Sequence, residues 1–70
     1  MLRLPQELVR LLLGPPLAAT TEPARMEELA RRYWPAIKAG GATEAWAYPL
    51  GWRIYFKDAR VVDITQYLIR

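Results

Sequence analysis

The chain has 70 residues, a formal net charge of +3 and no cysteine or histidine, and 53% of its residues are hydrophobic. Without these two residue types, disulfides and thiolate or imidazole metal sites are excluded. A chain of this length buries only about 60% of the surface that its unfolded form exposes. We therefore expect a single small domain over residues 1–70 that depends on very good packing or on association with another chain.

The first predicted element is a helix from about Gln6 to Leu13. Pro5 suits the start of a helix, and Gly14 followed by two prolines ends it. The large apolar side chains of this helix occupy more of its surface than one buried face requires; they are Leu8, Val9, Leu11, Leu12 and Leu13. The helix is therefore expected either to be wedged between two surfaces or to contact another molecule.

The second predicted helix runs from Glu22 to about Ala39 and stops at two glycines. Apolar residues recur along it at the spacing of one helical stripe, at Met26, Leu29, Ala30, Tyr33 and Ile37. Pro35 is discordant, because a proline inside a helix removes a backbone hydrogen bond and clashes with the preceding turn. We expect a kink or a break near Trp34.

The sequence Tyr-Pro-Leu-Gly at residues 48–51 predicts a hairpin with a three-residue loop. Pro is preset for the second position of a type I turn, and Gly readily takes the left-handed conformation that closes such a loop. If residues 49–51 are the loop, Trp46 lies opposite Ile54 and Ala45 lies opposite Tyr55.

A second hairpin is predicted with an odd-length loop, either residues 58–60 or residues 57–61. An odd loop places Ile54 opposite Ile64. A two-residue loop at 58–59 would instead place Lys57 opposite Arg60, which is a like-charge pair. It would also place Ile54 opposite Asp63 and so bury a carboxylate, which is unfavourable. We expect the odd loop because only it keeps the apolar side chains on one face.

Together these elements predict an α+β fold in the order α-α-β-β-β, with two N-terminal helices followed by a three-stranded antiparallel β-meander. Residues alternate between the two faces of a sheet. The face expected to lie inside, beneath the helices, carries Trp46, Trp52, Ile54, Phe56, Val62 and Ile64. The second face carries Ala45, Ala47, Arg53, Tyr55, Lys57, Val61, Asp63 and Thr65.

Catalysis is not expected, because the inventory of reactive side chains is short. With no His or Cys, a general base or nucleophile would have to be a carboxylate, Lys, Tyr or Thr. The polar residues of the second sheet face, Arg53, Tyr55, Lys57 and Asp63, are better explained as cross-strand pairs. The sequence has no glycine-rich phosphate loop, zinc-ligand spacing or acidic calcium loop, so we expect no enzyme activity, no cofactor and no metal.

The expected function is protein–protein interaction by a small regulator or subunit that self-associates, as a homodimer or within a larger complex. The first helix, the second sheet face or both would carry the contact, because one small core does not cover all the apolar residues. The candidate interaction surface consists of Leu8, Leu12, Ala45, Ala47, Arg53, Tyr55, Lys57 and Val61. The alternative is a monomer in which the two helices cover opposite faces of the sheet.

A second functional hypothesis is nucleic-acid binding. The isoelectric point of about 9.7, three tryptophans and four tyrosines are compatible with it, since aromatic and basic side chains together hold single strands. The basic face would consist of Arg53, Lys57 and Arg60 with Tyr55. This hypothesis is the weaker one, because the register places most strand aromatics on the face that helices must cover.

No membrane span is expected, because the longest apolar run, Leu11 to Ala19, is interrupted by Gly14 and two prolines. The same interruption, together with Glu7, argues against a secretory signal, so we expect a cytoplasmic protein. The chain has no Asn or Ser and has eight Arg against two Lys. This composition indicates either a thermophilic source or a GC-rich genome.

Overall fold

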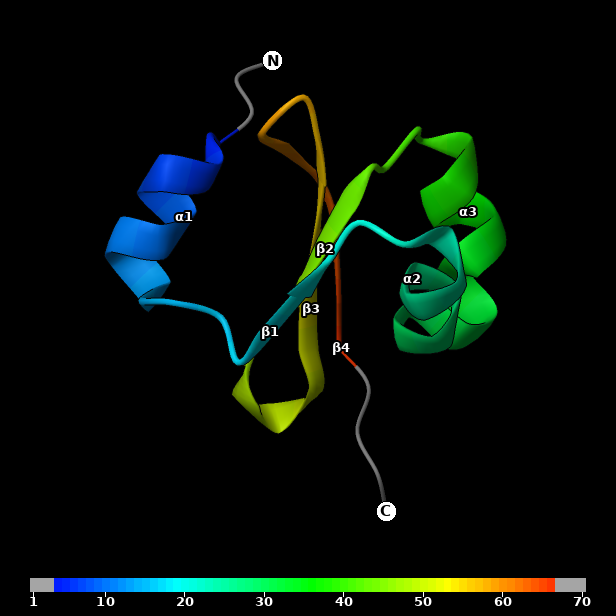
Figure 1. Ribbon diagram of the computed structural model, residues 1–70, viewed down its shortest axis with the longest axis horizontal. Coiled ribbons are helices and arrows are strands. Elements are labelled where there is room, and N and C mark those ends of the chain that lie inside the picture. Colours follow the sequence, from blue (N-terminus) through cyan, green and yellow to red (C-terminus); the bar gives the residue numbers. More distant parts are fainter. Residues whose placement is uncertain (1–3, 67–70) are drawn as a thin grey trace.

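The computed structural model of the chain describes residues 4–66 (Figure 1). Its helices are α1 (Gln6–Leu13), α2 (Pro23–Ala30) and α3 (Trp34–Ala39), and its strands are β1 (Ala18–Thr20), β2 (Glu44–Ala47), β3 (Trp52–Lys57) and β4 (Arg60–Gln66). Two 3₁₀ turns, η1 (Arg31–Tyr33) and η2 (Pro49–Gly51), join α2 to α3 and β2 to β3. The strands form one antiparallel sheet in the order β1-β2-β3-β4.

The predicted α+β class is confirmed, but the predicted three-stranded meander is incomplete, because β1 adds a fourth strand at its edge. β1 comes from the segment between the first two helices, where the sequence indicates only a connection. It is three residues long and pairs with β2, with Ala19 opposite Trp46. A run of Ala-Ala-Thr is too short to show the alternation that marks a strand.

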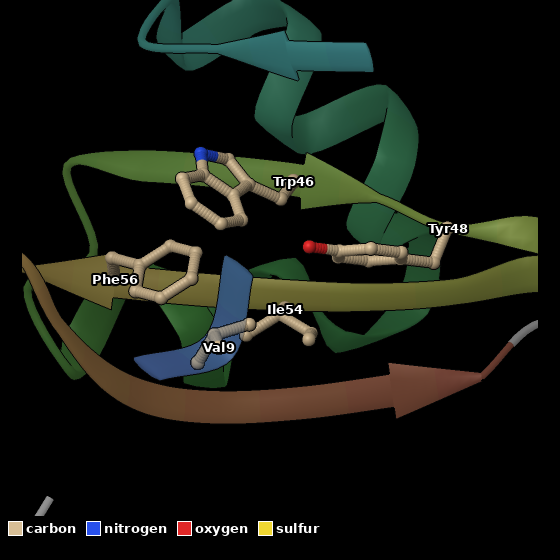
Figure 2. Close-up of a cluster of buried hydrophobic side chains, with 5 residues drawn as sticks. All are labelled: Val9, Trp46, Tyr48, Ile54 and Phe56. Atoms are coloured by element: carbon tan, nitrogen blue, oxygen red, sulfur yellow. The ribbon is translucent and has the colours of Figure 1, made fainter. Parts of the chain in front are cut away.

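The sheet lies between helices, with α1 against one face and α2 and α3 against the other (Figure 1). The first face holds the α1 cluster, which consists of Val9, Trp46, Tyr48, Ile54 and Phe56 (Figure 2). The second face holds the α2 cluster, which consists of Met26, Ala30, Ile37, Ala45 and Tyr55. We call the first face, which carries Trp46, Tyr48 and Phe56, the aromatic face. The prediction that both helices cover the aromatic face is therefore wrong. Small side chains at Ala30 and Ala45 allow the helix and the second face to pack closely.

The first hairpin is confirmed. η2 forms its loop, the Tyr48 N–H donates to the Trp52 carbonyl at 2.8 Å, and Trp46 pairs with Ile54 as predicted. Leu50 and Gly51 both have positive φ angles, 64° and 80°. The loop therefore closes with two left-handed residues, of which only the glycine is signalled by the sequence.

The second hairpin differs from the prediction of an odd loop. Its turn has two residues, Asp58 with φ 52° and Ala59 with φ 62°, and a register shift follows Tyr55. The shift is a bulge that adds one residue to β4, so the predicted pairing of Ile54 with Ile64 is still reached. The two-residue turn and the favourable register coexist because the bulge separates them.

The bulge also changes which side chains lie inside. Val61 packs against the α1 cluster and Val62 against the α2 cluster, the reverse of the predicted faces. Trp52 and Ile64 lie on the aromatic face as predicted, but they are exposed. The remaining residues expected inside are buried as predicted: Trp46, Ile54 and Phe56.

The second predicted helix is broken, as Pro35 indicates, but the break begins earlier than Trp34. Arg31 has a φ of 53° and ends α2. After η1 the chain resumes as α3, in which Trp34 and Pro35 form the first turn. Pro35 thus occupies a position where a missing backbone N–H costs little.

Candidate functional site

α1 is held against the sheet by hydrogen bonds near both of its ends. Near its start, Gln6 Nε2 donates to Glu44 Oε1 at 2.9 Å, and the other carboxylate oxygen of Glu44 accepts from Trp46 Nε1 at 2.6 Å. Behind its end, the Tyr48 hydroxyl donates to the Gly14 carbonyl at 2.9 Å. These hydrogen bonds determine which part of the sheet the helix covers.

The covered part of this face is a packed core. Phe56 is fully buried, and its ring centroid lies 4.7 Å from that of Trp46 with the planes tilted by 59° (Figure 2). Tilted aromatic pairs contribute about 0.5–1.5 kcal/mol beyond the burial of their area. Val9 is the residue of α1 that is buried in this core.

The remaining part of the same face is uncovered. Where β3 begins, an apolar groove of about 400 Å³ is lined by Leu13, Tyr48, Pro49, Trp52, Ile54 and Ile64. Trp52 and Ile64 are 43% and 51% exposed. We call these six residues, together with Leu12, the apolar surface.

The end of α1 contributes two leucines to the apolar surface. Leu12 and Leu13 follow Val9 by three and four positions, so they lie on the same side of the helix as Val9. They are nevertheless 67% and 58% exposed, because nothing within residues 4–66 packs over them. Leu11 lies on the outward side of the helix and is also exposed.

The structure divides the predicted interaction surface between the two faces. Leu8 and Leu12 lie on α1, where Leu8 is half-buried, and Val61 is half-buried beneath this helix. On the other face, Ala45 and Tyr55 are fully buried in the α2 cluster and do not belong to any surface. The other predicted members on that face are the half-buried Ala47 and Arg53 and the exposed Lys57.

The apolar surface contains residues that the sequence reasoning missed as surface residues. Leu13, Trp52 and Ile64 line the groove. Trp52 and Ile64, which lie on strands, were expected in the core beneath the helices. Their exposure depends on where α1 ends over the sheet. The one signal in the sequence is the helix stop at Gly14, which leaves the start of β3 without a helical cover.

Tyr55 is enclosed between the sheet and the helices that cover it. Its hydroxyl lies 3.1 Å from Thr65 Oγ1, and burial raises the pKa of the phenol above its ordinary value of 10.0. Because Tyr55 is fully buried, it does not stack on a nucleic-acid base. The predicted basic face of Arg53, Lys57 and Arg60 therefore lacks an exposed aromatic partner from this position.

Two further features of residues 4–66 bear on the kind of site. No three acidic, histidine or cysteine side chains gather there as ligands for a metal ion. No helix in this part of the chain has the length and apolar character needed to cross a membrane. The apolar surface is the candidate site, because it gathers exposed large apolar side chains around one groove.

Comparisons of the chain with protein-family models, with curated proteins and with solved structures find no match.

Proposed function

We propose that the protein is a non-enzymatic module that acts through protein–protein interaction and self-associates through the apolar surface. The observation that carries this proposal is the exposure of Leu13, Trp52 and Ile64 around one groove, with the exposed Leu12 next to Leu13 on the same helix. Contiguous apolar groups rimmed by polar ones are typical of protein contact sites. Isolated exposed leucines, in contrast, need no explanation.

The free energy for the contact comes from burying this surface. Full burial of a leucine or isoleucine side chain contributes about 1.5–3 kcal/mol. Between a third and somewhat more than half of each of these four residues is already buried, so we expect on the order of 5 kcal/mol from the four together in one chain. Both copies bury these residues in a self-association, so the gain per contact is about 10 kcal/mol, and a cost on the order of 5 kcal/mol in lost motion leaves a Kd on the order of 0.1–1 mM. We therefore expect the associated fraction to rise between micromolar and near-millimolar chain concentration.

Leucine-to-glutamate variants of α1 test the proposal, because the helix presents leucines in two directions. Leu12→Glu and Leu13→Glu place a carboxylate in the apolar surface, and Leu11→Glu places one on the outward side of the same helix. We expect the first two variants to lower the solution mass at near-millimolar concentration, with Leu11→Glu matching the wild type. Equal masses for all four chains would contradict the proposal.

A spectroscopic measurement locates the contact. The Trp52 indole lies in the groove, while the indole of Trp46 is hydrogen-bonded within the fold. We expect the indole N–H resonance of Trp52 to move with chain concentration and that of Trp46 to stay in place. Concentration-dependent shifts confined to Trp46 would rule out the groove as the contact.

A further inference from the structure

The two edges of the sheet differ in how their backbone groups are satisfied. At the outer edge of β4 and the turn before it, the Val61 N–H donates to the Leu4 carbonyl at 2.9 Å and the Gln6 N–H donates to the Ala59 carbonyl at 2.8 Å. Further along β4, the Ile64 N–H donates to the carboxylate of its neighbour, Asp63 Oδ1, at 2.8 Å. Two N–H groups of β4 that could attract another strand, those of Val61 and Ile64, are thereby occupied.

β1 forms the other edge. The Tyr48 N–H donates to the Trp52 carbonyl, and alternation from that bond assigns the backbone groups of Ala45 and Ala47 to β1. The N–H and C=O of Ala19, which lies opposite Trp46, therefore point away from the sheet. No strand within residues 4–66 pairs with this side of β1.

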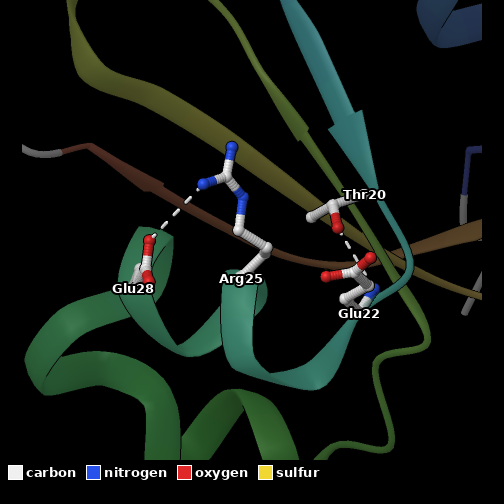
Figure 3. A network of polar contacts seen from close by, with 4 residues as sticks. All are labelled: Thr20, Glu22, Arg25 and Glu28. Carbon is white, nitrogen blue, oxygen red and sulfur yellow. Dashed lines mark hydrogen bonds and ion pairs between the residues drawn. The ribbon is translucent and has the colours of Figure 1, made fainter.

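A groove of about 370 Å³ runs beside this edge, between β1 and α2. Its helical wall carries Glu22, Arg25 and Glu28 at a spacing of three residues, so the charges alternate in sign (Figure 3). Arg25 Nη1 lies 3.8 Å from Glu28 Oε2, and both side chains are more than half exposed. The charged row is therefore accessible to a second set of charges.

We propose that a second copy of the chain occupies this edge, with β1 pairing antiparallel to the β1 of its partner. A two-fold axis perpendicular to the sheet and midway between Ala19 and its counterpart lets the two residues exchange both backbone hydrogen bonds. The four-stranded sheets then join into one continuous sheet. Because the axis keeps equivalent faces on the same side, α2 lies beside the partner's α2 and runs in the opposite direction.

Charge and side-chain size both fit this occupant. An alternating row that meets its own reversed copy with an offset of one position places each Arg25 next to a glutamate of the other chain, either Glu22 or Glu28, and the proposed pairing requires this offset. The small side chains of Ala18 and Ala19 leave the edge open to a neighbouring strand. The pairing uses no residue of the apolar surface, so it stands or falls independently of the proposed function.

Charge variants test this pairing in a full chain that also carries Leu12→Glu, so that the apolar surface is disabled. In that background we expect a mass twice 8.1 kDa at near-millimolar concentration. Arg25→Glu makes the row wholly negative, and the double change Glu22→Arg with Glu28→Arg makes it wholly positive. Each chain alone is expected at 8.1 kDa, and an equimolar mixture is expected to recover the doubled mass, because opposite rows then meet.

Recovery on mixing identifies a contact between copies, since the broken pair of Arg25 with Glu28 within each chain is not repaired by mixing. A mass of 8.1 kDa for the background chain, or a mixture that stays monomeric while circular dichroism shows both chains folded, would overturn the proposal. If the charge variants fail to fold, amide hydrogen exchange of the wild type decides. Exchange at Ala19 is expected to slow as concentration rises, whereas a rate independent of concentration would refute the pairing.

Discussion

Phe56→Ala tests the division of the aromatic face into a covered core and an uncovered surface. Phe56 is fully buried, packs in the α1 cluster and pairs with the Trp46 ring at 4.7 Å. Removing a buried phenylalanine ring costs about 3–5 kcal/mol of unfolding free energy, which includes the cost of the cavity that the ring leaves behind. A 70-residue domain has a total stability of roughly 4–10 kcal/mol, so we expect this one substitution to remove a large share of it.

Urea unfolding followed by circular dichroism measures this loss at a fixed, micromolar chain concentration. Lys57→Ala is the control, since Lys57 is the next residue of the same strand and is exposed; its effect should stay within about 0.5 kcal/mol. Each kcal/mol corresponds to a fall of roughly 4–8 °C in Tm for a domain of this size. Equal losses of unfolding free energy for the two variants, or equal shifts in Tm when the same chains are unfolded by heat, would show that the assignment of faces is wrong.

Three further predictions concern other contacts of the fold. Ile54→Ala is expected to destabilise the protein by about 2–5 kcal/mol in the same urea assay, because Ile54 is buried in the α1 cluster; a loss under about 0.5 kcal/mol would remove it from the core. Glu44→Ala removes the acceptor shared by Gln6 and Trp46, which should cost about 1–3 kcal/mol and shift tryptophan fluorescence, whereas no change in either would show that this carboxylate does not hold α1. Burial raises the pKa of Tyr55 above 10.0 in the folded chain, so the folded state favours the neutral phenol. The stability that this group contributes is present below about pH 10 and is lost as the pH rises further. Tyr55→Phe should therefore flatten the alkaline loss of stability in urea unfolding at pH values from about 8 to 11.

The register of the first hairpin was predictable because one loop length decides every pairing that follows it. Pro49 and Gly51 mark the ends of that loop, and the pairing of Trp46 with Ile54 then follows from counting. The second hairpin was not predictable in the same way. A bulge adds one residue without a distinctive sequence signal, and the adjacent Val61 and Val62 are equally suited to either face.

The assignment of helices to faces also lay beyond the sequence. Alternation shows which residues share a face, but both faces here carry large apolar side chains, and Tyr55 is as suitable for burial as Phe56. The surplus of leucines on α1 did indicate an unpartnered helix surface, and Leu12 is exposed as expected for it. Trp52 and Ile64 were missed because their exposure depends on the position of α1 over the sheet, which long-range hydrogen bonds such as that from Tyr48 to Gly14 determine.

Sedimentation equilibrium of the wild type and the Leu13→Glu variant, each at micromolar and near-millimolar concentration, tests self-association through the apolar surface most directly. We expect the wild-type mass to exceed 8.1 kDa and to rise with concentration, and we expect the variant to be lighter than the wild type at the higher concentration. A mass of 8.1 kDa for both chains at both concentrations would contradict self-association. Equal masses above that value would instead exclude the apolar surface as the contact.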